Sequence, residues 1–150
     1  MLPFDRYPKD RQELLPAPNR ANTRREDGPR LQRLTGQTSC AYCEVDLTTD
    51  YYRWLLTSID HVIPLKEGKR LGIDKAWCES FSNTVICCLG CNAFDNRYAI
   101  QGEWEGEDWT LDEFFVLRDR VFAERKARIL ERRKDEMDFF QGRPWEPPRT

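Results

Sequence analysis

The sequence lacks the features that would place it in a membrane or mark it for export. No stretch is long and apolar enough to span a bilayer, and the opening residues 1–5 hold neither a basic segment nor an apolar run. The formal net charge is only −2, which argues against a chain coated in basic residues for non-specific adhesion to nucleic acid. We therefore expect a cytoplasmic protein without a membrane partner, folded as one domain with a modest core.

Histidine is the scarcest of the side chains that carry chemistry, because the chain has only one, His61. It stands in the run Asp60-His61-Val62-Ile63-Pro64. An imidazole with an ordinary pKa of about 6.5 can take a proton from water at neutral pH. The carboxylate of Asp60 is a hard oxygen ligand of the kind that Mg²⁺ or Mn²⁺ prefers. A single histidine is more often structural, so this pair alone predicts little.

The chain has six cysteines, and four of them form two Cys-x-x-Cys pairs, Cys40 with Cys43 and Cys88 with Cys91. In a cytoplasmic protein such pairs bind metal more often than they form disulfides. Four thiolates in two knuckles predict a tetrahedral structural zinc site, and the alternative is two independent pairs of buried thiols. The pairs are too far apart for a simple zinc ribbon, so a folded segment must lie between them. We expect Cys87 in the core and assign no role to Cys78.

Charge is unevenly distributed along the chain. Residues 1–39 hold 8 basic and 5 acidic side chains, residues 118–150 hold 10 and 7, and residues 40–117 hold 6 and 14. An acidic centre between basic ends suits a site that holds a divalent cation while the ends contact phosphates. Solvated charge on loops and helix faces is the more ordinary explanation.

Local patterns predict an α+β fold in three parts. Residues 1–35 should form an extended or poorly ordered arm, residues 36–101 a compact core, and residues 102–150 an acidic turn, a long helix and a Pro-rich tail. We expect strands over 55–64 and 83–87, a long connection over 65–82 with a short helix near 74–80, and a helix from 91 to about 100. A capping box at 110–113 should begin the long helix, which extends to about Phe140. Apolar residues at helical spacing mark it: Leu111, Phe114, Phe115, Phe122, Ile129 and Met137.

Two asparagines follow the second cysteine pair. Asn92 and Asn96 are four residues apart, so on a helix they project from the same face. Their amide oxygens could complete the shell of a cation bound by Asp60. A capping role near the helix start is an equally good explanation for Asn92.

Three segments together resemble the HNH endonuclease family, in the branch whose members contain zinc. They are Asp60-His61-Val62-Ile63-Pro64, Ser82-Asn83-Thr84-Val85-Ile86-Cys87-Cys88 and Leu89-Gly90-Cys91-Asn92. The match covers roughly residues 40–100 and agrees in both the order and the spacing of its motifs.

The resemblance implies a ββα-metal (His-Me finger) core, in which two strands and a helix hold one catalytic divalent cation. It implies that His61 is the general base that activates water and that Asn83 orients the loop bearing the imidazole. Asn92 would bind the catalytic Mg²⁺ or Mn²⁺ together with Asp60, and Asn96 would add a further ligand. Cys40, Cys43, Cys88 and Cys91 would bind a separate structural zinc.

The sequence departs from the family pattern in two places. The final motif position is Asn92 rather than histidine, and Asp95 stands where members often carry a lysine. Arg97 is the nearest side chain that could supply the missing positive charge. In the loop after Pro64, the basic residues Lys66, Lys69 and Arg70 are candidate phosphate contacts, although a solvated loop is about as good an explanation.

We therefore expect an endonuclease that hydrolyses DNA, with RNA as an alternative substrate. Two other functions fit the same sequence: a catalytically weak, zinc-stabilised nucleic-acid-binding module, and a protein-interaction domain whose zinc is purely structural. Trp104 and Trp109 fit a core role better than base stacking. The long helix should pack on the domain with its charged distal half exposed, where a homodimer contact is an alternative.

Overall fold

The computed structural model describes residues 2–7, 14–18, 22–94, 97–102 and 108–142. At its centre is a two-stranded antiparallel sheet of β1 (Thr57–His61) and β2 (Thr84–Cys88), in which His61 lies opposite Thr84. The second strand is β-branched and apolar, as predicted, and every residue in it is buried. The short helix α5 (Leu89–Ala93) follows directly. The mixed helix-and-strand class and the chain order strand, strand, helix agree with the sequence prediction.

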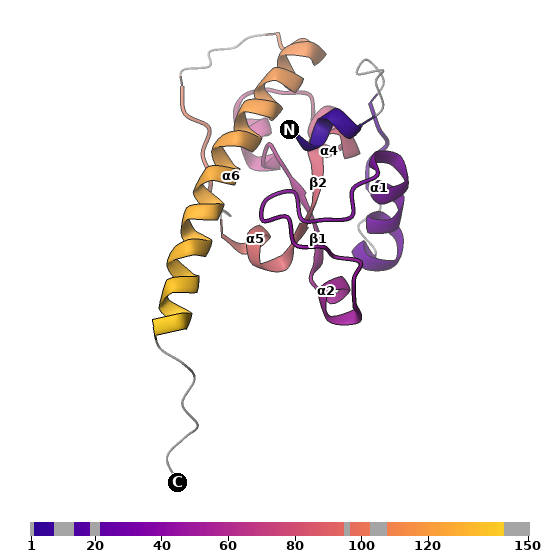
Figure 1. Ribbon diagram of the computed structural model, residues 1–150. Helices are drawn as coiled ribbons and strands as arrows, with labels where there is room; N and C mark the ends of the chain where they lie inside the picture. The colour runs from indigo at the N-terminus through magenta and orange to yellow at the C-terminus, as the bar shows by residue number, and fades with distance from the viewer. Residues whose placement is uncertain (1, 8–13, 19–21, 95–96, 103–107, 143–150) are drawn as a thin grey trace.

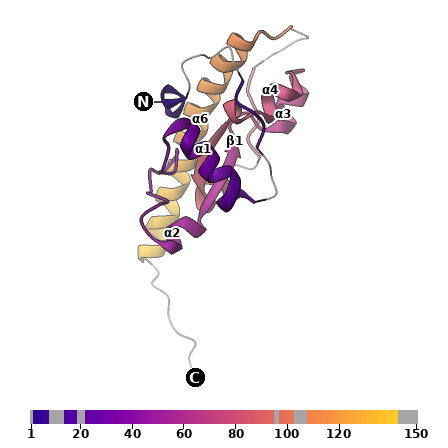
Figure 2. The same ribbon diagram turned by 90° about the vertical axis from the view of Figure 1, so that its right-hand side faces the viewer.

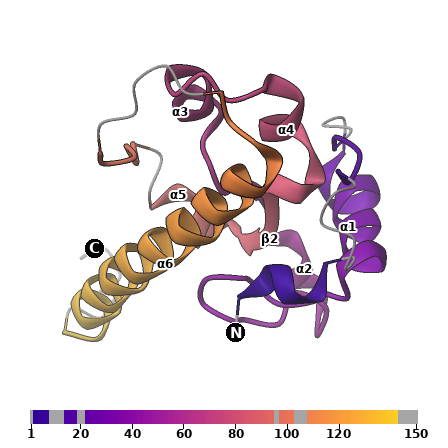
Figure 3. The same cartoon turned by 90° about the horizontal axis from the view of Figure 1, so that it is seen from above.

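The helices surround this sheet. Figures 1 and 2 show α6 (Leu111–Gly142) along one side and α1 (Gly28–Thr35) on the other. The short helix α2 (Tyr51–Leu55) precedes the start of β1, and Asp50 caps it by accepting a hydrogen bond from the Arg53 amide at 2.9 Å. At the far end of the sheet lie α3 (Leu65–Arg70) and α4 (Lys75–Glu79), visible beyond the sheet in Figure 3.

The long helix begins as its sequence predicts. The Thr110 amide donates to Glu113 Oε2 at 2.8 Å, and the Glu113 amide donates to Thr110 Oγ1 at 3.2 Å, which is a complete capping box. The buried face follows helical spacing and consists of Phe114, Phe115, Leu117, Arg118, Val121, Phe122, Arg125 and Ile129. Figure 3 shows the C-terminal part of α6 extending away from the sheet. Met137, which we expected on the apolar face, is 49% exposed.

The N-terminal segment differs from the predicted extended arm. Its described part contains a 3-10 turn, η1 (Pro3–Arg6), a short π-helix, η2 (Thr23–Asp27), and α1. Phe4 is 3% exposed and packs against Phe122 of α6 with ring centroids 5.5 Å apart. The Tyr7 hydroxyl donates to the carbonyl of Thr84 in β2. The prediction failed because isolated apolar residues in a Pro- and Arg-rich segment show no periodicity, although a small core still uses them.

Two further boundaries differ from the prediction. Residues 65–70 form a helix where we expected an irregular connection, whereas the expected short helix near 74–80 is present as α4, capped by Asp74. After α4 comes the 3-10 turn η3 (Phe81–Asn83), which leads into β2. The helix expected from 91 to about 100 begins earlier, at Leu89, and ends at Ala93. Among the described helices, none is both long enough and apolar enough to cross a membrane.

Candidate metal centre and active site

The first Cys-x-x-Cys pair forms a tight turn beside the sheet. The Glu44 amide donates to the Cys40 carbonyl at 2.9 Å, and the Cys43 amide points to Cys40 Sγ at 3.5 Å. Glu44 closes the turn in the left-handed region, with a φ of 65°. The Ala41 amide donates to the Ile86 carbonyl of β2 at 2.9 Å, which fixes this knuckle against the strand.

The second pair lies where β2 meets α5. Cys88 ends the strand, and its Sγ accepts a hydrogen bond from the Cys91 amide at 3.4 Å as the N-cap of the helix. The Sγ atoms of Cys40, Cys43, Cys88 and Cys91 all lie within 4.8 Å of one another. All six cysteines are among the described residues, and all are free thiols.

This cluster fits a metal such as zinc. A tetrahedral zinc with Zn–S bonds of about 2.3 Å places its sulfurs about 3.8 Å apart. The Cys43 and Cys88 sulfurs are 3.8 Å apart. Hydrogen bonding among the sulfurs raises the pKa of Cys40 to about 11 and lowers the pKa of Cys88 well below its ordinary value, chiefly through the Cys40–Cys88 bond. Thiolates are the form of cysteine that binds a metal, so a metal bound here would displace the thiol protons. The structure therefore brings together the four cysteines that the sequence singled out.

The other two cysteines are core residues. Cys87 is fully buried, as predicted, and burial raises its pKa well above the ordinary range. Cys78 is 3% exposed, and burial raises its pKa to about 11. Its sulfur lies against Gly68 of α3, where a Cβ would come within 2.4 Å. Close packing is thus a role for Cys78 that the sequence did not indicate.

Asp60 contacts Tyr42 and Arg125 inside the fold. The Tyr42 hydroxyl donates to Asp60 Oδ2 at 2.5 Å, and Arg125 Nη1 lies 2.8 Å from the same oxygen. The same guanidinium nitrogen also donates to the carbonyls of His61 and Val62, each at 2.9 Å. Asp60 therefore takes part in a buried network that links the first knuckle, the end of β1 and α6.

His61 ends β1, and strand alternation assigns its side chain to the face opposite that of Asp60 and Ser58. The residue is half-buried, and its Nε2 atom is buried. The sheet thus places the carboxylate and the imidazole of the Asp-His pair on opposite faces at the end of the strand.

Asn83 is fully buried and fastens the chain that follows His61. Its Oδ1 accepts from the Ile63 amide at 3.0 Å, and its Nδ2 donates to the carbonyls of Ile63 at 2.9 Å and Cys78 at 2.8 Å. Its own carbonyl accepts from the Val62 amide at 2.8 Å. Three of these four hydrogen bonds fix the two residues after the imidazole, and the fourth ties Asn83 to the end of α4.

Asn92 lies on the same face of β1 as Asp60. Its Nδ2 donates to Ser58 Oγ at 2.8 Å, and Ser58 is two residues before Asp60 in the strand. Cys88, rather than Asn92, is the N-cap of α5, so the capping explanation for Asn92 is wrong. Asn96, the further ligand implied by the family resemblance, lies outside the described residues.

The predicted phosphate contacts divide into two kinds. Lys66, Lys69 and Arg97 are exposed. Arg70 is also on the surface, but its guanidinium bonds Glu67 at 2.7 Å and the Ile100 carbonyl at 3.0 Å. The first three side chains can reach a ligand without breaking such contacts, whereas Arg70 has a structural role.

The two tryptophans proposed for the core have different outcomes. Trp109 is partly buried against the core, and its Nε1 donates to the Leu71 carbonyl at 2.9 Å. A core role therefore fits Trp109. Trp104 lies outside the described residues.

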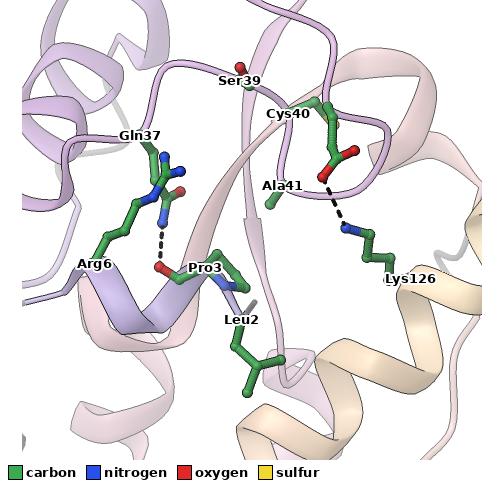
Figure 4. Close-up of a pocket in the computed structure, with 9 residues that line it drawn as sticks. Leu2, Pro3, Arg6, Gln37, Ser39, Cys40, Ala41 and Lys126 are labelled. Atoms are coloured by element: carbon green, nitrogen blue, oxygen red, sulfur yellow. Dashed lines mark hydrogen bonds and ion pairs between the residues drawn. The ribbon is translucent and has the colours of Figure 1, made fainter.

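A cavity of about 220 Å³ opens between η1, the first knuckle and α6 (Figure 4). Gln37 reaches across it to donate to the Pro3 carbonyl at 3.2 Å, and Lys126 pairs with Glu44 at 3.8 Å. Asp60, His61 and Asn92 are not among its lining residues. The cavity is therefore separate from the candidate active site.

Three residues that contact the candidate site residues were not predicted from the sequence: Tyr42, Ser58 and Arg125. Arg125 falls four residues before Ile129 on the buried face of α6, so a charged residue at a core position was the signal for it. Ser58 lies two residues before Asp60 in β1, so the strand period of two places both side chains on the same face. Tyr42 gave no signal, because an aromatic residue inside a Cys-x-x-Cys pair suggests only packing.

Comparisons with protein-family models, with curated proteins and with solved structures found no match for this chain.

Proposed function

We propose that the chain is a metal-dependent HNH endonuclease that hydrolyses phosphodiester bonds of DNA. His61 is the general base, Asn83 is the positioning residue for it, and the four paired cysteines hold a structural zinc. The observation that carries this proposal is the Asn83 tether. A buried amide that bonds both the N–H and the carbonyl of Ile63 supports the positioning role that the resemblance assigns to the middle motif residue.

The chemistry of the proposal divides among these residues. His61 accepts a proton from the attacking water, and Asn83 keeps the backbone that carries the imidazole in one conformation. Asp60 would bind a catalytic Mg²⁺ or Mn²⁺ through its carboxylate, and Asn92, which bonds Ser58 on the same face of β1, would offer its amide oxygen. Such a cation, when bound, supplies positive charge beside the scissile phosphate and the leaving 3′ oxygen.

A second function is favoured by a specific observation. Arg125 neutralises the Asp60 carboxylate at 2.8 Å, and the Nε2 atom of His61 is buried. Strand alternation also assigns the imidazole to the face of β1 opposite the carboxylate. A cation competes poorly for a carboxylate that is already paired, and a shielded imidazole on the other face has poor access to water beside that cation. These features suit a zinc-stabilised nucleic-acid-binding module that cleaves weakly or not at all.

Cleavage of supercoiled plasmid DNA separates the two functions. The wild type is incubated with Mg²⁺, with Mn²⁺ and with EDTA, and His61→Ala and His61→Gln are compared with it at equal zinc content. The nuclease proposal expects metal-dependent nicking that falls on the order of 10²–10⁴-fold in both variants.

The other outcomes contradict the nuclease proposal. Nicking that survives both substitutions rules out His61 as the base. Salt-dependent DNA binding without nicking supports the binding module, because phosphate contacts release counterions. The absence of both activities leaves only the protein-interaction domain. Circular dichroism and zinc content of each variant ensure that a lost activity does not reflect a lost fold.

A further inference from the structure

Arg133 reaches from the distal half of α6 to the cysteine cluster. Its Nη1 lies 3.3 Å from Cys88 Sγ, 3.3 Å from Cys91 Sγ and 3.5 Å from Cys43 Sγ. It is half-buried, whereas the residues on either side of it in the helix are exposed. One donor nitrogen therefore contacts three of the four sulfurs that would bind the metal.

The second knuckle leaves room for this contact. Its two central residues are Leu89 and Gly90, and a Cβ placed on Gly90 would touch Arg133 Nη1 at 3.5 Å. With glycine at this position, no side chain stands between the guanidinium and the sulfurs. The guanidinium is therefore in direct contact with the cluster on this side.

The charge of the occupied centre explains why an arginine belongs there. A divalent zinc bound by four thiolates leaves two negative charges in a cluster that is mostly buried. Hydrogen bonds from outer-shell groups to ligand atoms strengthen metal binding, and their loss typically costs about 10–100-fold in metal affinity. The guanidinium stays protonated at all accessible pH values and offers several donors in a rigid plane. We propose that Arg133 is the outer-shell cation of the zinc centre, where it offsets the thiolate charge and slows the loss of the metal.

The same contact has a second consequence for α6. Arg132, the preceding residue, donates to the Phe94 carbonyl just after α5 at 3.2 Å. Beyond Ile129 the helix side chains are largely exposed, so these two arginines link its distal half to the second knuckle. Arg132 contacts a carbonyl and Arg133 contacts sulfur, which makes Arg132 a matched control for Arg133.

The inference rests on the metal-binding part of the proposed function and is independent of nuclease activity. The test uses the full chain loaded with zinc, and compares Arg133→Gln, Arg133→Lys and Arg132→Gln with the wild type. Zinc release is followed in excess chelator with a colorimetric zinc indicator. We expect Arg133→Gln to lose zinc about 10-fold faster or more. Arg133→Lys should fall between Arg133→Gln and the wild type, and Arg132→Gln should stay close to the wild type.

A spectroscopic measurement separates the role at sulfur from a role in folding. In the cobalt-substituted protein, the sulfur-to-metal charge-transfer band should shift in Arg133→Gln, because its thiolates lose a hydrogen-bond donor, and should stay in place in Arg132→Gln. Equal zinc release and unshifted bands in the two glutamine variants would overturn the inference. If Arg133→Gln does not fold, Arg133→Lys is compared with the wild type and Arg132→Gln instead, by the same measurements of zinc release and of the cobalt charge-transfer band. A wild type that binds no zinc rejects both this inference and the structural zinc, whereas zinc retention without nuclease activity rejects only the nuclease.

Discussion

The guanidinium of Arg125 and the carboxylate of Asp60 form an ion pair of 2.8 Å inside the fold, with 3% and 11% of the two side chains exposed. Bringing two charges out of water is costly, and the pair compensates only while both partners are present. Arg125 also bonds the carbonyls of His61 and Val62, so the pair fixes the position of the β1 end against α6. The strand end that carries the proposed base is thus held in place by Arg125 of α6, which lies 64 residues after His61 in the sequence.

Breaking this pair from either side should destabilise the protein strongly. Asp60→Asn leaves the buried Arg125 guanidinium without this ion-pair partner. Arg125→Met in turn leaves the buried Asp60 carboxylate without the guanidinium. Each substitution should lower the free energy of unfolding by about 3–5 kcal/mol. The double variant should lose clearly less than the sum of the two, measured by urea unfolding at pH 7 with equal zinc content.

The exposed pair of Arg120 and Glu124 is the control for this cycle, with 3.5 Å between its charged atoms and nearly half of each side chain exposed. Arg120→Met should cost about 0–1 kcal/mol. Strictly additive losses for the Asp60 and Arg125 substitutions would show that the two charges do not interact in solution.

The effect of Gly68→Ala on the free energy of unfolding should change sign when Cys78 is replaced by alanine. Alanine normally stabilises a helix interior by about 1 kcal/mol relative to glycine. In α3, however, a Cβ on Gly68 would meet Cys78 Sγ at 2.4 Å, and overpacking typically costs about 1–3 kcal/mol. We expect Gly68→Ala to lower the free energy of unfolding in the wild type and to raise it in a Cys78→Ala background. Thermal and urea unfolding of the four proteins measure both effects, and the same sign in both backgrounds contradicts the packing role of Cys78.

Glu67 should contribute stability that depends on pH. Hydrogen bonds from Arg70 lower its pKa from an ordinary value of 4.5, and its Oε2 also accepts from the Ile100 amide at 2.9 Å. Because the folded-state pKa of Glu67 is depressed, its contribution to the free energy of unfolding is complete above about pH 4.5. This contribution disappears as the pH falls through the folded-state pKa. Glu67→Gln should therefore cost about 2 kcal/mol at pH 7, and the difference from the wild type should narrow below pH 4.5.

Urea unfolding of both proteins between pH 7 and pH 4 tests this expectation. Any zinc is released in acid from both proteins, so only their difference at each pH is informative. The exposed pair of Lys75 and Glu79, 3.7 Å apart, supplies the control Glu79→Gln, which should stay within about 1 kcal/mol of the wild type throughout. A difference for Glu67→Gln that is the same at pH 7 and pH 4 contradicts the role of its carboxylate charge.

The sequence predicted the parts of the protein that local rules determine. The capping box that begins at Thr110 and the buried strand before Cys88 depend on neighbouring residues, and both are present. The cysteine cluster was also predictable, because residue type and spacing alone specify a pair of metal knuckles. Helix α3 was not predicted. Gly68 lies inside it, and the close contact of this position with Cys78 explains why glycine is used there.

Contacts between distant segments could not be predicted in this way. Arg133 looks like an exposed charge on a helix, and although Arg125 falls at a core position, only the packing of α6 brings it to Asp60 and brings Arg133 to the cysteines. Phe4 and Tyr7 gave no periodic pattern, yet both are core residues. The packing of long elements therefore accounts for most of what the sequence did not show about the site.

Asn83 provides the last prediction, because its tether distinguishes positioning from mere packing. Asn83→Ala removes three side-chain hydrogen bonds from a fully buried position and should cost about 3 kcal/mol, since each is worth roughly 1 kcal/mol. Asn83→Asp keeps the shape and the acceptor for the Ile63 amide, but it replaces the donor to Ile63 and Cys78 with a second oxygen. Urea unfolding should therefore show that both variants are destabilised. In Asn83→Asp, the carbonyls of Ile63 and Cys78 repel the second carboxylate oxygen.

Ser82→Ala is the matched control, because the neighbouring Ser82 side chain bonds only the Leu15 amide in the described structure, at 2.9 Å. We expect a loss of about 1 kcal/mol there. If Asn83 positions the base, plasmid nicking by Asn83→Ala under conditions where it stays folded should fall far more than nicking by Ser82→Ala. Equal activity in the two folded variants would mean that Asn83 only stabilises the chain, and that the loop after His61 holds the imidazole without it.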